Sequence, residues 1–403
     1  MNISSPDILH ECTSCQMCAA VCPTTAIGIS LSHDGFYRPT VNPAKCIDCG
    51  LCVQVCYKYD TKIILTDQDA LNRTTLWAAV AKDDMVVAET TSGGIADLLA
   101  RQLVEKGYQC IGVGYDSNLD IAYDTIARKY EEVQTFRGSK YIQSYTLPAF
   151  RELVKDCKKK KFAVFGTPCH IYAVDKYLNF RGVRNNSVLI DLYCHGCPSL
   201  YLWWKYVCEI KSLVGASKFD VLNFRSKIKG WGNFCVVGTV KGVNAFVSSP
   251  RKDEFYTLFF SDTILNGACN TCHLRSTLAY TDIRLGDFWG KRYALNIRGM
   301  SAVSVISPAG RDLLESISGK IVKKKEDYKD FLRYQSWGKI YMPNIALRKE
   351  LLQQISDPAI PLIDSVRTLY QHRSLIRKWG CLVKRVTYYL PMRLVALIKR
   401  VYY

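Results

Sequence analysis

The sequence lacks any long apolar run, and this absence bears first on membrane insertion. No stretch approaches the ~18 apolar residues that a membrane-spanning helix needs, although 48% of the residues are hydrophobic. The first ten residues, MNISSPDILH, have neither a basic n-region nor an apolar h-region, which excludes a typical secretory signal peptide. We therefore expect a folded cytoplasmic protein, whose 403 residues leave room for two or three domains.

Acidic residues are fewer than basic ones, so the formal net charge is +18. The chain has no acidic residue after Asp364. We expect residues 331–403 to form a basic helical tail. Basic amphipathic segments rich in Trp and Tyr can lie in a membrane interface, here at the inner surface; equally, such a helix can pack on the body with its charges in water. No nucleic-acid reading motif accompanies the charge, so no nucleic-acid partner is expected. The basic residues beyond Asp364 are Arg367, Arg373, Arg377, Lys378, Lys384, Arg385, Arg393, Lys399 and Arg400.

Cysteine, in contrast, is abundant, with 18 residues. Nothing in the sequence indicates an oxidising compartment, so metal ligation is expected and a disulfide framework is not. Two runs between residues 12 and 56 have the C-x2-C-x2-C-x3-C spacing of two-cluster ferredoxins, in which the fourth cysteine of each run reaches the other cluster. The spacing predicts one [4Fe-4S] cluster on Cys12, Cys15, Cys18 and Cys56, and a second on Cys46, Cys49, Cys52 and Cys22.

The residue after each run supports this interpretation. Pro23 closes the first run, and Tyr57 stands where the second proline would be. Because the proline shapes the turn and is not a ligand, Tyr57 leaves the prediction unchanged. Zinc is the alternative metal, but it usually takes two C-x2-C pairs and gains nothing from a third cysteine at the same spacing. Residues 1–62 are therefore predicted to be a ferredoxin-type module that carries electrons.

The next segment has the pattern of an α/β domain. Residues 61–80 predict a strand, a turn and a second strand, and residues 109–127 predict two neighbouring strands joined by an Asp-Ser-Asn turn. Between them, Thr91 or Ser92 is an expected N-cap for a helix with an apolar face. The glycine-rich turn there could bind a phosphate through free backbone N–H groups, although most such turns simply begin a helix.

A second set of cysteines follows two buried-strand patterns. Cys169 comes three positions after the end of FAVFG, and Cys194, His195 and Cys197 come after VLIDLY. Ligands often bind at the carboxyl ends of parallel strands. With a later C-x2-C pair, five thiols are candidate ligands, and spacing leaves zinc and iron–sulfur both open; they are Cys169, Cys194, Cys197, Cys269 and Cys272.

Five other cysteines have no partner at metal spacing and are expected to be small buried hydrophobic residues. They are Cys110, Cys157, Cys208, Cys235 and Cys381.

Seven ordered motifs carry a family resemblance: TSGGIADLL, RGSKYIQS, GTPCHI, CHGCPS, FRSKIKGW, CNTCHL and DIRLGDFWG. Behind a two-cluster ferredoxin module, they make roughly residues 1–300 resemble the coenzyme F420 hydrogenase/dehydrogenase beta-subunit family. The resemblance implies a mixed α/β flavin-binding domain with an N-terminal part, residues 63–165, and a C-terminal part, residues 166–330. The basic helical tail would follow.

The same resemblance implies cofactors beyond the two clusters. A third [4Fe-4S] cluster would be held by Cys169, Cys194, Cys269 and Cys272, leaving Cys197 as a spare thiol. FAD would bind beside it, at the positions that match the flavin-side motifs. These positions are Ser92, Gly93, Gly94, Gly138, Ser139, Lys140 and Tyr141.

We therefore expect an iron–sulfur flavoprotein oxidoreductase. Electrons would come from ferredoxin or a partner redox subunit and pass through the clusters to FAD and a small organic acceptor. The acceptor would be coenzyme F420-like or an intermediate of polysaccharide biosynthesis. Candidate catalytic residues, for contact with flavin or substrate, are Lys140, His195, Arg225 and Lys227. A non-catalytic ferredoxin-type relay or docking subunit, and an interaction protein with a structural zinc site, are the alternatives.

Overall fold

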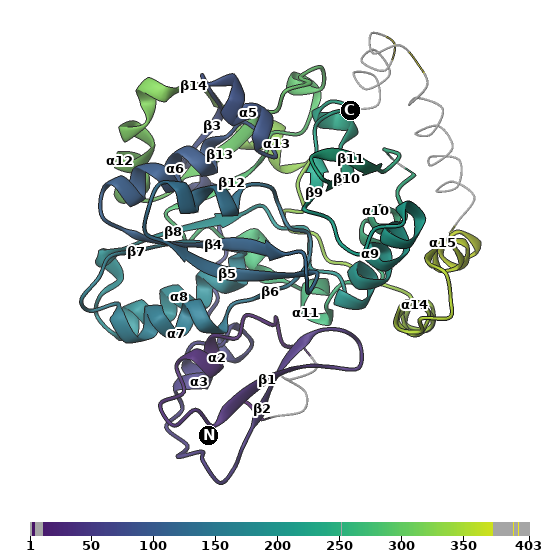
Figure 1. Ribbon diagram of the computed structural model, residues 1–403. Helices are drawn as coiled ribbons and strands as arrows, with labels where there is room; N and C mark the ends of the chain where they lie inside the picture. Colours follow the sequence, from purple (N-terminus) through teal and green to yellow (C-terminus); the bar gives the residue numbers. More distant parts are fainter. Residues whose placement is uncertain (1, 5–10, 251, 374–389, 391–393, 395–403) are drawn as a thin grey trace.

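The computed structural model of the protein describes residues 2–4, 11–250, 252–373, 390 and 394. The chain has a mixed α/β fold built on a nine-stranded sheet (Figure 1). A small N-terminal module lies below this sheet in the view of Figure 1, and a three-stranded sheet lies beside it.

The large sheet has the strand order β14-β3-β13-β12-β8-β7-β4-β5-β6. Its central strands β12, β8, β7 and β4 are parallel to one another, and β5 and β6 form a further parallel pair. Apolar runs such as FAVF form the centre because parallel strands are covered on both faces. The strands are β3 (Thr75–Ala81), β4 (Gln109–Asp116), β5 (Ile121–Ala127), β6 (Ser144–Tyr145), β7 (Phe162–Phe165), β8 (Ser187–Leu192), β12 (Ile283–Asp287), β13 (Ser301–Val305) and β14 (Ile321–Glu326).

Helices cover both faces of this sheet (Figure 1). On one face, α5 (Asp84–Glu89), α6 (Ile95–Glu105) and α12 (Pro308–Ser316) pack their apolar side chains on the strands. On the other face lie α7 (Leu147–Asp156) and α8 (Pro168–Phe180), whose far side packs on the N-terminal module.

A second core lies beside the sheet. The small sheet β11-β10-β9 packs there with a group of helices, and Trp203 stacks on Phe224 with 3.9 Å between ring centroids. The elements are α9 (Leu200–Val214), β9 (Val221–Ser226), β10 (Cys235–Val240), β11 (Val243–Val247), α10 (Glu254–Phe259), α14 (Ile345–Ser356) and α15 (Leu362–Gln371). Three short helices complete the body, α4 (Gln68–Asn72), α11 (Gly267–Asn270) and α13 (Tyr328–Leu332).

The predicted basic tail is described only in part. Its first half contains α14 and α15, and the stretch after residue 373 lies outside the described residues except for 390 and 394. Within the described part of the chain, none of the helices has both the length and the apolar character to cross a membrane.

The N-terminal module consists of the hairpin β1 (Ile27–Leu31) and β2 (Tyr37–Val41), with α2 (Met17–Ala20), α3 (Leu51–Gln54) and the short 3-10 helix η1 (Tyr57–Tyr59). Met17 and Ala19 of α2 are fully buried in the core shared with α7 and α8. The module is therefore joined to the larger body by a continuous apolar core.

Two local predictions differ from the structure. Residues 62–65 form no strand, because backbone N–H groups in and next to this segment are hydrogen-bonded to the loop that begins at Ser276. Thr66 N–H donates to the Ser276 carbonyl at 2.9 Å, and Ile64 N–H donates to the Tyr280 hydroxyl at 3.0 Å. The N-cap of α6 is Gly94, at φ 83°, and not Thr91 or Ser92. The two neighbouring strands predicted between residues 109 and 127 are present and pair antiparallel.

Candidate metal centres and the neighbouring polar site

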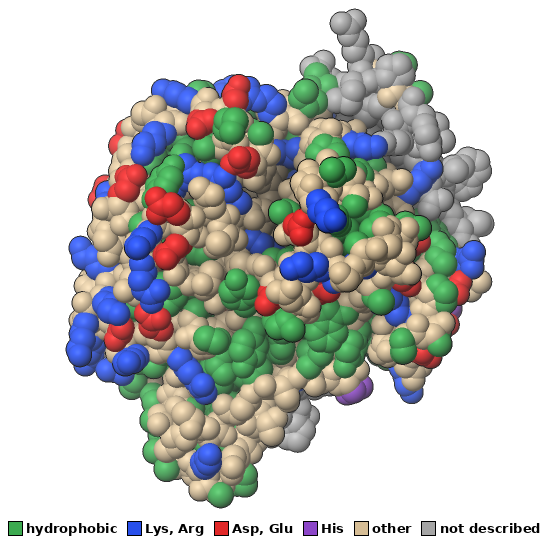
Figure 2. All heavy atoms as spheres, in the orientation of Figure 1, with side chains coloured by type: hydrophobic (Ala, Val, Ile, Leu, Met, Phe, Trp, Pro, Cys, Tyr) green, Lys and Arg blue, Asp and Glu red, His purple; other side chains and the backbone are tan. Residues whose placement is uncertain are grey.

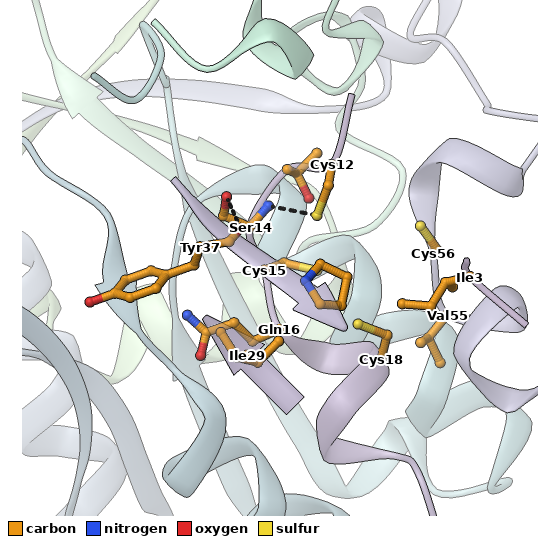
Figure 3. A pocket seen from close by; sticks show the side chains of 12 residues that line it. Ile3, Cys12, Ser14, Cys15, Gln16, Cys18, Ile29, Tyr37, Val55 and Cys56 are labelled. Atoms are coloured by element: carbon orange, nitrogen blue, oxygen red, sulfur yellow. Dashed lines mark hydrogen bonds between the residues drawn. The ribbon is translucent and has the colours of Figure 1, made fainter. Parts of the chain in front are cut away.

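Four cysteines line one cavity in the N-terminal module (Figure 3). This cavity is also lined by apolar side chains such as Ile29 and Val55. The loop before α2 curls tightly, with Ser14 at φ 64° and Gln16 at φ 60°, so that cysteines two residues apart face one space. The four are those predicted to share a cluster, Cys12, Cys15, Cys18 and Cys56.

The other four cysteines of the two runs line a second cavity. Asp48 at φ 49° and Gly50 at φ 76° form the corresponding tight loop. Cys49 is exposed, and the side chain of Ile47 beside it is 63% exposed. The cysteines are Cys22, Cys46, Cys49 and Cys52, so each run contributes its fourth cysteine to the other group.

Backbone and side-chain N–H groups point at several of these sulfur atoms. Ala26 N–H donates to Cys22 Sγ at 3.2 Å, and Ser14 N–H donates to Cys12 Sγ at 3.4 Å. Such donors stabilise thiolates and tune the potential of an iron–sulfur cluster. Burial raises the pKa of Cys15 to about 11 and that of Cys56 to about 12, so metal binding here must displace protons.

The second set of cysteines is assembled from three places in the sequence. Cys169 lies in the first turn of α8 directly after β7, with its sulfur 3.1 Å from Thr167 Oγ1. Cys194 and Cys197 follow β8, and Cys269 lies in α11, three residues before Cys272.

The five thiols of this set are near enough to influence one another's pKa. Burial raises the pKa of Cys197 strongly, and the neighbouring thiols of Cys269, Cys194 and Cys169 raise it further. The pKa of Cys169 is likewise raised by burial and then by Cys15 of the N-terminal module. The structure thus places Cys197 among its neighbours, and it places the whole set beside the first group.

Two buried arginines provide positive charge next to these thiols. Arg275, 4% exposed, donates to the carbonyls of Cys269 and His195, the latter at 3.1 Å. Arg284, 2% exposed, pairs with Asp191. Burial raises the pKa of Cys194 to about 11, and the charges of Arg275 and Arg284 offset part of this rise. Buried charges in such a place offset the negative charge of a thiolate-bound cluster.

No three Cys, His, Asp or Glu side chains of the described residues lie close enough to hold a single metal ion. A tetrahedral zinc site would need each sulfur about 2.3 Å from one ion. The two cysteine groups of the N-terminal module instead surround cavities.

A polar site forms where three predicted flavin-side segments meet. Lys227, after β9, donates to the carbonyls of Val87, Ser92 and Arg298, at 2.9 Å for Ser92 and 2.6 Å for Arg298. Ser139 N–H donates to Thr91 Oγ1 at 2.9 Å. Burial, together with the charge of a nearby arginine, lowers the pKa of Lys227 to about 8. Figure 2 shows a hollow near the middle of one face, with Lys or Arg side chains in its depth.

Arg225 is the most buried cation of this site, at 3% exposure. It forms an ion pair with Asp287 and donates to the Tyr141 hydroxyl at 3.1 Å. Its guanidinium lies 5.0 Å from the ring centre of Trp289, which stacks on Trp231 at 4.5 Å. Its Nε and Nη2, like Ser92 Oγ, are buried without a hydrogen-bond partner among the described residues.

Two of the candidate catalytic side chains have other partners. Lys140 Nζ lies within hydrogen-bond distance of four backbone carbonyls, among them Val113 at 2.8 Å and Arg137 at 2.9 Å. His195 Nε2 lies 2.8 Å from Asp262 Oδ1, and its Nδ1 lies 3.1 Å from both Ser336 and Tyr341 hydroxyls. Lys140 thus holds the loop around residues 135–140, and His195 is anchored beside the second cysteine set.

The glycines of the 92–94 turn are explained by packing. A Cβ on Gly93 would lie 2.5 Å from the Ala79 carbonyl, and a Cβ on Gly94 would lie 2.8 Å from Val86. Gly93 N–H donates to Ser301 Oγ at 2.9 Å. The turn therefore needs glycine to approach the sheet, whether or not a phosphate binds. Gly138 lies at φ 79°, which glycine adopts without strain.

Sequence reasoning missed several residues of these sites. Asp287, Trp231 and Trp289 lie within quoted motifs but received no role, because only the fold shows that they meet Arg225. Among the cysteines expected to be buried, Cys110, Cys157 and Cys235 are, whereas Cys208 is exposed on α9 and Cys381 lies outside the described residues.

Two family models match parts of the chain. Residues 11–58 match the family described as 4Fe-4S dicluster domain. Residues 159–330 match the family that describes the C terminus of the coenzyme F420 hydrogenase/dehydrogenase beta subunit. No curated protein matches the chain.

Thirteen chains of known structure match. One comes from the xenon-derivatized F420-reducing [NiFe] hydrogenase complex of Methanosarcina barkeri. It is 19% identical, with 73% of this chain and 91% of that chain covered and a TM-score of 0.47. The chain therefore contains, at residues 159–330, the C-terminal domain of the coenzyme F420 hydrogenase/dehydrogenase beta-subunit family, and, at residues 11–58, a 4Fe-4S dicluster domain.

Proposed function

We propose that this protein is an iron–sulfur flavoprotein oxidoreductase that passes electrons from a redox partner through [4Fe-4S] clusters to FAD and an organic acceptor. The observation that carries the proposal is a shared sheet edge. The parallel strands β7, β8 and β12 lead at their carboxyl ends to Cys169, Cys194 and Asp287. Tyr193 N–H, one residue before Cys194, donates to the Leu285 carbonyl at 2.8 Å. Ligands of α/β sheets bind at this edge, so the second cysteine set and the Arg225 site can serve one reaction.

The second cysteine set suits a third [4Fe-4S] cluster. Its thiols converge from loops that a buried arginine ties together, and buried positive charge is close by. Following the family resemblance, we assign the ligands as Cys169, Cys194, Cys269 and Cys272, with Cys197 as an adjoining thiol.

The Arg225 site suits a polar, anionic cofactor such as FAD. Arg225 and Ser92 have buried polar atoms without a partner among the described residues, and buried polar groups are normally hydrogen-bonded. FAD, when bound, would collect electrons singly and deliver them in pairs to an organic acceptor. Lys227 holds the Ser92 turn in place, and Tyr141 and Asp287 fix the orientation of Arg225. Lys140, Gly138 and Ser139 shape the loop on the other side.

The exposure of the cysteines suggests where electrons enter. Cys49 is exposed, which makes the second group accessible to ferredoxin or a partner redox subunit. Burial raises the pKa of Cys18, and the thiols of its own group and Cys52 of the second group raise it further, so the two groups adjoin. Cys15 of the first group in turn lies near Cys169.

For the organic acceptor we propose two classes of compound. A coenzyme F420-like deazaflavin is our first choice because of the family, and a polysaccharide-pathway intermediate is the second.

We also propose that the chain is divided into residues 1–62, 63–165, 166–330 and 331–403, with strands on both sides of residue 165 sharing one sheet. Contact of the tail with the inner membrane surface belongs to residues that are mostly outside the described part.

One anaerobic preparation, analysed for iron, sulfide, zinc and flavin, tests the proposal. About twelve irons and one FAD per chain are expected, since each [4Fe-4S] cluster holds four irons. About eight irons without flavin would indicate instead a ferredoxin-type relay or docking subunit. About one zinc in place of the third cluster would indicate a structural metal site.

Variants of Arg225 sharpen the flavin part. Arg225→Lys keeps the charge opposite Asp287 but lacks the fork of N–H donors, so flavin content should fall while iron content is unchanged. Arg292→Lys, on the surface with a 50% exposed side chain, is the matched control and should retain flavin. Full flavin content in Arg225→Lys would contradict the placement of FAD at this site.

A further inference from the structure

Tyr57 joins the N-terminal module to the second cysteine set. It directly follows Cys56 of the first group, and its hydroxyl oxygen accepts a hydrogen bond from the His273 backbone N–H at 3.1 Å. His273 directly follows Cys272. A chain of covalent bonds with a single hydrogen bond therefore runs from Cys56 through the tyrosine ring to Cys272.

The surroundings hold the ring in this position. Tyr57 is 6% exposed and makes an edge contact with Tyr172 at 5.9 Å between ring centroids. Tyr172 in turn contacts Tyr280 at 4.7 Å. Leu274 completes this buried cluster, and the partly buried Cys169 and Cys272 pack against it.

This position is the one at which the ferredoxin-type run departs from its usual pattern. Proline closes the first run as Pro23, whereas the second run has a tyrosine. Proline has neither an aromatic ring nor a hydroxyl group that could reach His273. The substitution thus provides a contact with the catalytic body that the usual residue would not make.

We propose that Tyr57 is a positioning residue that couples the first cluster to the third one for electron transfer. The inference rests on the proposed function, because it requires a cluster on the second cysteine set. With clusters bound, Cys56 would help to hold the reduced donor cluster and Cys272 the oxidised acceptor cluster, and one electron would pass from the first to the second. No bond forms or breaks, and no proton is transferred.

A second route competes with this one. Burial raises the pKa of Cys169, and the nearby thiol of Cys15 raises it further, so an electron could also pass between these two cysteines. That route does not pass through the phenol of Tyr57. Removing only the hydroxyl group therefore distinguishes the two routes.

The test compares Tyr57→Phe with Tyr280→Phe in the full-length, cluster-loaded protein. Tyr280 is the matched control, because its hydroxyl also accepts a backbone N–H, from Ile64 at 3.0 Å, but this bond does not join the two cysteine groups. The protein is mixed with a limiting amount of dithionite, and the time at which each cluster becomes reduced is measured by freeze-quench EPR. Hydrogen exchange at the His273 amide gives a readout that is independent of activity.

We expect Tyr57→Phe to keep its full iron content, to slow reduction of the third cluster severalfold, and to speed exchange at His273 about fivefold, as loss of one ordinary hydrogen bond would do. Tyr280→Phe should change neither quantity. Unchanged reduction of the third cluster in Tyr57→Phe, or loss of iron from it, would overturn the inference. Only about eight irons in the unmodified protein would instead refute the proposed function.

Discussion

Gln16 caps the start of a helix that belongs to a different part of the chain. Its side-chain oxygen accepts hydrogen bonds from the backbone N–H of Thr146 at 3.1 Å and from that of Leu147 at 3.0 Å, and its side-chain nitrogen donates to the Ser144 carbonyl at 3.1 Å. Gln16 lies between Cys15 and Cys18 and is 2% exposed. One side chain of the cysteine loop thus provides the N-terminal hydrogen bonds of α7.

Replacing Gln16 by Ala should destabilise the protein by about 3 kcal/mol, because three buried backbone groups would lose their partner. The free energy of unfolding, measured with denaturant on the cluster-loaded protein, checks this. Gln68→Ala is the control, since Gln68 bonds to Asn72 on an exposed helix, and its change should stay within about 0.5 kcal/mol. Equal stability of the two variants would show that the docking of the module does not depend on Gln16.

Arg275 holds together the two loops that carry most of the second cysteine set. It donates to the carbonyls of Cys269 and His195, and also to that of Lys339 at 2.6 Å. Its guanidinium lies 4.2 Å from the ring centre of Tyr341. A lysine at this position could not make the same contacts, because its ammonium group lacks the planar set of N–H donors of a guanidinium.

Arg275→Met should therefore lower the iron content from about twelve to about eight per chain, while the EPR signals of the N-terminal clusters remain. Arg275→Lys should retain part of the third cluster with an altered reduction potential. Arg333→Met, at an exposed arginine, serves as the control and should keep all the iron. A fully loaded Arg275→Met variant with an unchanged potential would refute the role given to this arginine.

The sequence predicted those features that depend on short-range pattern. Cysteine spacing grouped Cys12 with Cys56, because in the two-cluster motif the fourth cysteine of each run belongs to the other cluster. The apolar run before Cys169 indicated a buried parallel strand with the thiol just beyond its end. The roles of Lys140 and Tyr57 could not be predicted in this way. Each depends on a backbone group that the fold brings from elsewhere in the chain.

The same limit explains why the strand predicted at residues 62–65 does not form and why Cys208, expected to be buried, is exposed. An apolar run forms a strand only where a neighbour offers free backbone groups, and here the Ser276–Tyr280 loop meets it first. A small apolar residue on a helix is buried only if its face is covered. Both outcomes are decided by tertiary contacts.

Asp124 is a buried carboxyl group that has no place in the proposed electron route. It lies on β5 opposite Val113 and is 5% exposed. Burial raises its pKa to about 7, and the Ser144 hydroxyl offsets part of that rise. The folded protein therefore favours the protonated form of this side chain at acidic pH.

The raised pKa makes stability depend on pH. Because the folded state holds this proton up to about pH 7 and the unfolded state loses it near pH 4, Asp124 contributes stability that is complete below about pH 4 and lost as the pH rises to about 7. At about 1.4 kcal/mol per pKa unit, the loss amounts to about 4 kcal/mol. Asp124→Asn should therefore be more stable than the unmodified protein at pH 8 and similar to it at pH 4.5.

Asp312→Asn, which replaces an exposed carboxylate, is the control and should have the same stability as the unmodified protein at every pH. Parallel curves of unfolding free energy against pH for Asp124→Asn and the unmodified protein would show that Asp124 is ionised in the folded state at all these pH values.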